Sequence, residues 1–183
     1  MDNELSLKAS REELAPAYKK MEDIENRSKR NNIVIWGLKE GAEATHNSLE
    51  DFLWVEFFEK HMQLQNIEVI KAHRPSVNQR ATEANTSTVR PNYIYLLRYS
   101  DKVQILKVAA NALKDNLSLD SQIFISDDVS KNVRKDRAKL RKDYLKGIKE
   151  SDVDFAFIPW SVPAQILFKD GNCSKIKILQ ASG

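Results

Sequence analysis

The chain has 183 residues, of which 42% are apolar and 30% are charged, and its formal net charge is +3. That length suits one domain or two small ones, and the apolar share is enough for a packed core. No run of about 18 apolar residues occurs, and the N-terminus has no basic start followed by an apolar block, so we expect neither a membrane span nor a signal peptide. The single cysteine, Cys173, cannot form an internal disulfide, and His46, His61 and His73 have no cysteine near them. These features predict a protein of the cytosol or nucleus that has no structural zinc.

The positive charge is concentrated in residues 131–149, KNVRKDRAKLRKDYLKGIK. This stretch has nine Lys or Arg and two acids, a local charge of +7, so the rest of the chain carries −4. Charge of one sign gains nothing from i,i+4 ion pairs and repels itself, and a polyanion would remove that cost. The alternative is a solvated helix face that keeps the protein in solution.

The first 26 residues are polar and helix-prone. Leu7, Leu14 and Met21 lie seven residues apart, which is coiled-coil spacing over a short length. Pro16 lacks an amide hydrogen and clashes with the preceding turn, so the pattern predicts a helix that begins at Pro16 and ends near Asn26. This helix is either solvated or the end of an oligomerising coiled coil.

Residues 29–127 alternate between strand and helix signals. Strands are expected at residues 33–38, 67–74, 92–99 and 121–126, and helices at residues 48–62 and 100–113. This β-α-β-β-α-β order predicts an α+β sandwich, in which two helices cover one face of a four-stranded antiparallel sheet and leave the other face open.

Local signals set the ends of these elements. Gly37 and Gly41 should end the first strand, and Asn47 with Glu50 resembles a capping box for the first helix. Ser100 should cap the second helix. The first helix is expected to bury one broad face, made of Leu49, Phe52, Leu53, Val55 and Phe57.

The remaining segments are a long loop and a tail. Residues 75–91 form a polar loop of a length that is usually functional or disordered. Ser130 should cap a basic helix, and short strands are expected in residues 153–160, 161–171 and 172–179. The sequence therefore predicts three segments, listed here by residue number: an N-terminal helix at 1–28, an α+β domain at 29–127, and a small C-terminal domain at 128–183. The last is small to be stable alone, so we expect it to dock on the α+β domain or to move on a hinge near residues 127–129.

Candidate nucleic-acid ligands are the basic residues of three clusters. The basic helix supplies Arg134, Arg137 and Arg141; a hinge before the first strand supplies Arg27, Lys29 and Arg30; the long loop and strand ends supply Arg74, Arg80, Arg90 and Arg98. Guanidinium groups suit forked contacts to phosphates and stacking on bases.

Arg137 is singled out by helix geometry. The residues that share its face are Val133, Leu140, Tyr144 and Ile148. An arginine within an apolar stripe needs an anion or an acceptor, and a phosphate would serve.

Aromatic residues also occur in the expected sheet. Trp36 lies in the first strand, and Tyr93, Tyr95 and Tyr99 lie in the third. Domains of this shape stack bases on aromatics of these two strands. Both faces of the strands are apolar, so core packing and base stacking remain open for these side chains.

Signals for an enzyme are weak. Asp127 and Asp128 are adjacent in a strand and point to opposite faces, so a shared acid–base site is not expected, and they should instead cap or hydrogen-bond the loop before the basic helix. The sequence has no glycine-rich phosphate loop, no Gly-x-Ser-x-Gly and no His-Glu-x-x-His. We therefore expect no enzymatic activity and no cofactor.

One family shares several of these motifs. The segment MEDIENRSKRNNIVIWGLKEG resembles the junction between the coiled coil and the RNA-recognition domain in the first open-reading-frame protein of LINE-type retrotransposons. The motifs IKAHRP, LLRYSDKVQILKVAANAL and IFISDDVSKNVRKDRAKLR follow in the family's order, so the resemblance covers residues 21–178.

The resemblance implies a trimerising coiled coil, an RNA-recognition-like domain, and a C-terminal domain of one helix and a few strands. It implies a protein that binds single-stranded RNA and DNA with little sequence preference, coats its own transcript in cytoplasmic ribonucleoprotein particles or in the nucleus, and acts as a nucleic-acid chaperone. The family's RNA contacts fall on Arg30 or its neighbours, Arg74, Arg98 and Arg137. The family's Tyr-Pro-Ala-Lys/Arg-Leu is replaced here by residues 162–166, VPAQI, and Trp160 would take over the stacking.

These observations predict that nucleic acid passes through a basic cleft between the two domains. The rival interpretation is a domesticated copy that serves as a protein-interaction module for an acidic partner.

Overall fold

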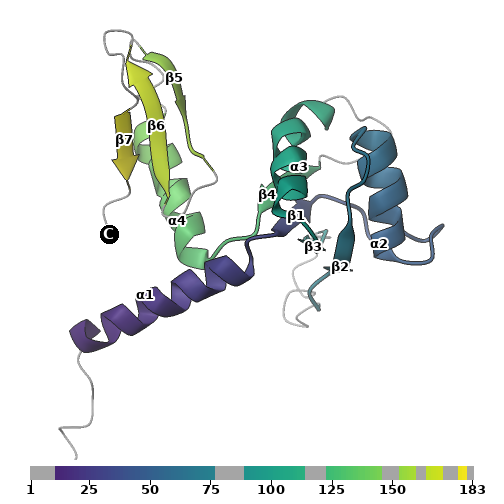
Figure 1. Ribbon diagram of the computed structural model, residues 1–183, viewed down its shortest axis with the longest axis horizontal. Coiled ribbons are helices and arrows are strands. Elements are labelled where there is room, and N and C mark those ends of the chain that lie inside the picture. The colour runs from purple at the N-terminus through teal and green to yellow at the C-terminus, as the bar shows by residue number, and fades with distance from the viewer. Residues whose placement is uncertain are drawn as a thin grey trace, which may run out of the picture. The chain divides into compact units, whose positions relative to one another are not determined.

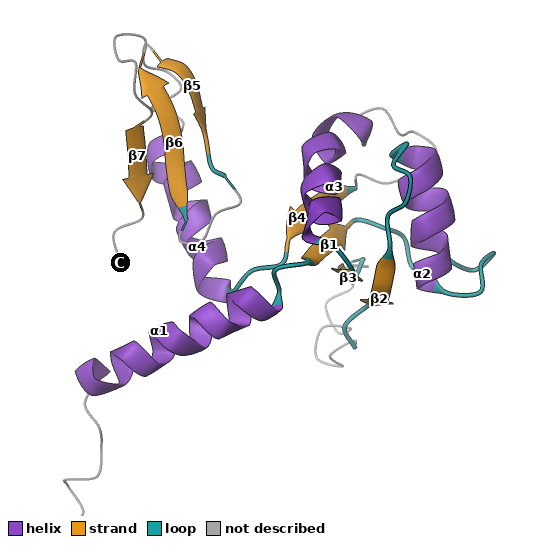
Figure 2. Cartoon of the chain, viewed as in Figure 1, coloured by secondary structure: helices purple, strands orange, loops and turns teal. Residues whose placement is uncertain are grey.

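The structure is a computed structural model that describes residues 11–76, 89–113, 123–145, 153–159, 164–170 and 177–180 (Figures 1 and 2). The chain forms two compact units. One unit is Lys29–Asp128, and the other combines Met1–Ser28 with Val129–Gly183. The long loop expected at 75–91 falls mostly outside the described residues.

The unit Lys29–Asp128 is a four-stranded antiparallel sheet with helices on one face. Its elements are β1 (Asn32–Trp36), α2 (Leu49–Phe52) with its continuation η2 (Leu53–His61), β2 (Val69–His73), β3 (Asn92–Leu96), α3 (Tyr99–Ala112) and β4 (Phe124–Asp127). The strands are arranged in the order β2-β3-β1-β4, and every neighbouring pair is antiparallel. The expected α+β class and the expected order of strands and helices are both observed.

One core lies between the helices and one face of the sheet. The sheet contributes Ile33, Ile35, Ile94, Leu96 and Ile125. The helices contribute Phe52, Leu53, Phe57, Phe58, Ile105, Leu106 and Ala109. These residues alternate with outward-facing ones along each strand, as a pleated strand requires.

The first helix departs from expectation at both its cap and its buried face. Ser48, not Asn47, is the N-cap, and its side chain accepts a hydrogen bond from the Asp51 amide. Val55 is 37% exposed, whereas Phe58, which was not predicted to face the core, is fully buried. The reason is that the helix widens to a π-helix at Leu53. Buried residues then recur five apart instead of three or four.

The start of the second helix also differs from expectation. Helix α3 begins at Tyr99, so Ser100 lies in its first turn instead of capping it. The Ser100 hydroxyl donates to the Asp101 carboxylate at 3.2 Å. Tyr99 therefore belongs to a helix and not, as predicted, to the third strand.

The other unit contains the N-terminal helix, the basic helix and a small sheet. These are α1 (Arg11–Ser28), α4 (Lys131–Leu140) with its continuation η5 (Arg141–Leu145), and the strands β5 (Val153–Phe157), β6 (Gln165–Asp170) and β7 (Lys177–Gln180). The strands form an antiparallel sheet in the order β5-β6-β7. Leu140, Ala164 and Ile166 are the buried core of this part of the unit.

Helix α1 contains Pro16 instead of beginning there. A proline inside a helix removes one hydrogen bond and crowds the preceding turn, but the residues around Pro16 are exposed, so the helix continues past it. The apolar residues Leu14, Tyr18, Met21 and Ile24 are all exposed on α1, at 38–64% of their full accessibility. Leu7 lies outside the described residues.

The beginning of α4 is tied to α1 through Ser130. As expected, Ser130 is the N-cap, and its Oγ accepts from the Val133 amide at 3.3 Å. The Ser130 hydroxyl also donates to Glu22 of α1 at 2.6 Å, and the Ser130 amide donates to Asn26 at 2.8 Å. Hydrogen bonds at Ser130 therefore connect α1, the predicted end of a coiled coil, to the basic helix α4.

The buried stripe of the basic helix is as expected for its first two turns only. Val133, Arg137 and Leu140 are buried, but Tyr144 is 44% exposed. The helix becomes π-helical at Arg141, so the next residue to pack on the core is Leu145, five after Leu140. Ile148 lies outside the described residues. In the described part of the chain, no helix has the length and apolarity needed to cross a bilayer.

Candidate nucleic-acid interface

The sheet of the unit Lys29–Asp128 carries aromatic side chains on the face opposite its core. Strand pairing places Trp36 beside Phe124 and Val34 beside Tyr93, while Asn32 lies opposite Tyr95. None of these residues belongs to the core between the sheet and the helices. We call the surface formed by Trp36, Tyr93, Tyr95 and Phe124 the aromatic face.

Two rings of the aromatic face are open to solvent and two are partly covered. Phe124 is 59% exposed and Tyr95 is 41% exposed. The Trp36 indole donates to the Ser126 hydroxyl at 3.1 Å, and the Tyr93 ring stacks on His73 with centroids 5.6 Å apart and planes 18° apart. Ordered rings of this kind are suitable for base stacking, which does not depend on sequence.

A shallow cavity of about 300 Å³ adjoins the aromatic face. Its lining includes Asn32, Lys71, His73, Tyr93 and Tyr95. It therefore combines stacking surfaces, one cation and one amide within a few residues of sheet. An unstacked base and its phosphate could be held by such a set.

Arg30 and Tyr99 form a second aromatic contact in this unit. The Arg30 guanidinium lies over the Tyr99 ring, 4.8 Å from its centroid. Tyr99 is 43% exposed. A guanidinium that lies over a ring can still donate its N–H groups to an anion.

Arg74 and Arg90 are held by carboxylates of the same unit. Arg74, with 9% of its side chain exposed, donates to both oxygens of Glu43 and to the Lys39 carbonyl at 3.2 Å. Arg90 donates to both oxygens of Glu40, at 2.9 and 2.7 Å. Both guanidinium groups are therefore neutralised locally and shape the segment from Lys39 to Glu43.

These ion pairs shift the acidity of the carboxyls. The hydrogen bonds from Arg90 are the main reason why the pKa of Glu40 is lowered to about 2. The Arg74 hydrogen bonds likewise lower the pKa of Glu43, and Glu40 raises the pKa of Arg90. Glu40, Glu43 and Arg90 are therefore ionised at neutral pH.

Two further predicted site residues of this unit, Arg98 and Lys29, lie close to carboxylates. Arg98 is 48% exposed, and its Nε donates to Asp101 at 3.2 Å while its Nη2 donates to the Asn66 carbonyl at 2.8 Å. Lys29 lies 3.7 Å from a carboxylate oxygen of Asp128. Asp128 also accepts from Asn32 at 3.3 Å, so this acid organises the loop before the basic helix.

Arg27 belongs to the unit that contains α1. It lies in the last turn of that helix, is 78% exposed, and pairs with Asp23 at 2.9 Å.

Among the residues that the structure describes, those of α4 and η5 present the densest exposed positive charge. Their exposed cations are Lys131, Arg134, Lys135, Lys139, Arg141 and Lys142. Two exposed acids, Asp136 and Asp143, lie among them. Arg137 is only 9% exposed and packs in the stripe with Val133 and Leu140. The positive charge that a ligand can reach on this helix therefore comes from its six exposed cations.

Two predicted site residues cannot be placed. Arg80 and Trp160 lie outside the described residues.

Phe124 of the aromatic face, and His73, which stacks on the Tyr93 ring of that face, were not predicted as site residues. The sequence offered no signal for Phe124, because Ile123, Phe124 and Ile125 are all apolar, and only the structure shows Phe124 exposed between two buried isoleucines. His73 offered no signal either.

The described residues contain no group of three or more His, Cys, Asp or Glu side chains that could hold a metal ion. No protein-family profile matches this sequence, and none of the curated proteins does.

Proposed function

We propose that this chain binds single-stranded RNA and DNA, with the aromatic face stacking bases and the exposed cations of α4 and η5 contacting phosphates. The observation that carries the proposal is the aromatic face, because four rings lie on adjacent strands and two of them are well exposed. Exposed rings on a sheet are costly in water unless a ligand covers them. Bases offer π-faces of the right size.

The strand order and the position of the aromatics support an RNA-recognition-like assignment for the unit Lys29–Asp128. In that class, aromatics of the first and third strands stack the bases. Here β1 and β3 are adjacent central strands, and they supply Trp36, Tyr93 and Tyr95. β4 adds Phe124 at the edge.

The resemblance to LINE-type retrotransposon proteins extends the proposal to a biological role. In that role the chain coats its element's transcript in ribonucleoprotein particles and acts as a nucleic-acid chaperone. Self-association would occur through α1. Its apolar residues Leu14, Tyr18, Met21 and Ile24 are exposed and are not among the residues described as the core of their unit. Non-specific phosphate contacts would suit a protein that must cover a long strand.

The test is a titration of a labelled single-stranded RNA of about 30 nucleotides, followed by fluorescence anisotropy. Tyr95→Ala should weaken binding roughly five- to 150-fold, because one base–aromatic stack contributes about 1–3 kcal/mol. Trp54→Ala is the matched control, since Trp54 is an exposed aromatic residue of the same unit and does not belong to the aromatic face. Equal affinities for the two variants would remove the aromatic face from the interface. No binding by the wild type at low salt would favour the protein-interaction alternative.

A further inference from the structure

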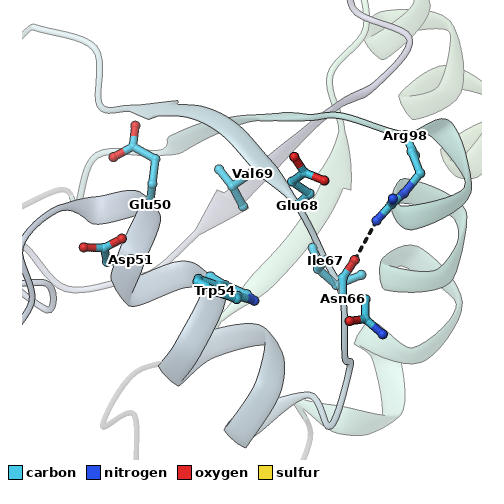
Figure 3. A pocket seen from close by; sticks show the side chains of 8 residues that line it. All are labelled: Glu50, Asp51, Trp54, Asn66, Ile67, Glu68, Val69 and Arg98. Carbon is cyan, nitrogen blue, oxygen red and sulfur yellow. Dashed lines mark hydrogen bonds between the residues drawn. The ribbon is translucent and has the colours of Figure 1, made fainter.

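A second hollow in the unit Lys29–Asp128 has a different chemistry. It has a volume of about 620 Å³ and lies between α2, the chain leading into β2, and Arg98 (Figure 3). Its lining residues are Glu50, Asp51, Trp54, Asn66, Ile67, Glu68, Val69 and Arg98. We call it the Trp54 pocket. None of these residues is part of the aromatic face.

The Trp54 pocket combines an exposed indole with apolar side chains. Trp54 is 52% exposed, although it is the largest apolar side chain on its helix. Ile67 is buried and Val69 partly buried beside it. The π-helical widening at Leu53 accompanies this exposure, because Phe57 and Phe58 take the core positions instead. The indole is thus available as one wall of the pocket.

The polar groups of the Trp54 pocket are mainly acidic. Glu50, Asp51 and Glu68 contribute three carboxylates, and Figure 3 shows Glu50 and Asp51 on the helix side and Glu68 on the strand side. One oxygen of Glu50 accepts from the Ala72 amide of edge strand β2 at 2.8 Å, which fixes this carboxylate in place. The one cation, Arg98, already donates to the Asn66 carbonyl and to Asp101.

An indole face next to several carboxylates suits a cationic side chain. A guanidinium or ammonium over tryptophan is attracted by the ring, and the carboxylates add charge-assisted hydrogen bonds. The alkyl stem of lysine or arginine can pack on apolar side chains while its head reaches the acids. A phosphate would be repelled by the same three carboxylates, which outnumber the one arginine, so the pocket disfavours nucleic acid.

This chain itself carries the complementary surface. Residues 129–183 contain twelve Lys or Arg and six Asp or Glu, a net charge of +6, whereas residues 29–128 contain twelve and thirteen, a net charge of −1. Six cations are exposed on α4 and η5. We infer that the Trp54 pocket binds a lysine or arginine side chain from α4 or η5 of a second copy of this chain.

Such a contact would link copies of the protein to one another. The Trp54 pocket and α1 belong to different units, so this contact would act in addition to the proposed self-association through α1. A cation held in the pocket cannot contact a phosphate at the same time. Nucleic acid and neighbouring copies therefore compete for part of the basic helix.

The test uses a fluorescently labelled synthetic peptide of residues 131–145, titrated with the full chain at low salt and followed by anisotropy. Trp54→Ala should weaken peptide binding about 2- to 30-fold, the range expected when one cation–π contact is lost. Val55→Ala is the matched control, because Val55 is the adjacent exposed residue and does not line the pocket.

Two charge-reversal variants distinguish binding in the pocket from attraction by the net charge of the unit. Glu68→Lys should abolish most of the binding, whereas Glu59→Lys changes the net charge equally at an exposed position outside the pocket and should have little effect. Equal loss in the two variants would overturn the inference, because it would show attraction by net charge alone. Absence of peptide binding to the wild type at low salt would overturn it as well.

Failure of this inference can be distinguished from failure of the proposed RNA binding, because the two are tested by different measurements. Trp54→Ala should bind the 30-nucleotide RNA at least as tightly as the wild type, since Trp54 lies outside the aromatic face and loss of the contact between copies frees cations of the basic helix. In sedimentation velocity at low salt, the wild type should form larger species than Trp54→Ala at equal concentration. Identical sedimentation of the two proteins would contradict a contact between copies.

Discussion

At the scale of single residues, the arginines of the unit Lys29–Asp128 have two different roles. Arg74 and Arg90 are held by Glu43 and Glu40 in forked ion pairs. Arg30 is positioned on Tyr99, where its N–H groups can be reached from solvent. Spacing in the sequence cannot separate these roles, because the partners of Arg74 and Arg90 lie 31 to 50 residues away along the chain.

The Glu40–Arg90 pair gives a pH prediction. Its hydrogen bonds lower the pKa of Glu40 from 4.5 to about 2. A carboxyl whose pKa is lower in the folded state stabilises the fold above its unfolded pKa. That contribution is lost as the pH falls from about 4.5 to about 2.

The measurement is an NMR titration of the Glu40 carboxyl. Wild type should titrate near pH 2, and Arg90→Gln should return the pKa of Glu40 toward 4.5, because its main hydrogen-bond donor is gone. Lys60→Gln is the control, since Lys60 pairs with Glu56 elsewhere in the unit. An unchanged pKa of Glu40 in Arg90→Gln would show that the ion pair does not form.

At the scale of elements, the main differences from expectation come from π-helical segments. Periodicity of 3.6 predicted Val55 and Tyr144 as buried, and both are exposed. Phe58 and Leu145, each five residues after a buried leucine, contact the cores instead. Apolar residues occur at both candidate positions in the sequence, so composition alone does not reveal where the helix widens. The strands were predictable because their alternation is regular.

The widened helix predicts unequal effects of two truncations. Phe58→Ala should destabilise the protein by about 3–5 kcal/mol, the usual cost of removing a buried phenylalanine side chain. Val55→Ala should change the free energy of unfolding by no more than about 0.5 kcal/mol, as for an exposed site. Urea denaturation followed by circular dichroism measures both. Comparable losses would indicate that the helix keeps 3.6 residues per turn here.

The contact between α1 and α4 gives a second prediction at this scale. Ser130 caps α4 and also bonds to Glu22 and Asn26 of α1. Ser130→Ala should cost about 0.5–2 kcal/mol for the cap itself. Glu22→Ala and Ser130→Ala should then be non-additive, with a coupling energy of about 0.5–3 kcal/mol.

A double-mutant cycle by urea denaturation measures that coupling. The control cycle combines Glu22→Ala with Ser48→Ala, because Ser48 caps α2 in the other unit through a hydrogen bond from the Asp51 amide. The control should be additive within about 0.5 kcal/mol. Additivity in both cycles would mean that α1 does not support the cap of the basic helix.

At the scale of the whole molecule, charge is divided unequally between segments of the chain. The C-terminal segment carries +6, while the sheet unit is nearly neutral at −1 and the first 28 residues carry −2. This partition was visible in the sequence, and so was the order of strands and helices. The aromatic face was not, because both sides of the strands are apolar and only pairing with the helices decides which side is covered. In the proposed function, α4 contacts the phosphates of a single strand and the aromatic face stacks on its bases.

The most direct test of this account is the salt dependence of single-stranded RNA binding. The double variant Arg134→Ala with Lys135→Ala removes two exposed cations of α4, and Lys19→Ala with Lys20→Ala removes two exposed cations of α1. The slope of log K against log salt should become shallower by about 1.4 in the α4 variant, because each lost phosphate contact on a single strand changes it by about 0.7. The α1 variant should keep the wild-type slope. Identical slopes for all three proteins would contradict phosphate binding by the basic helix.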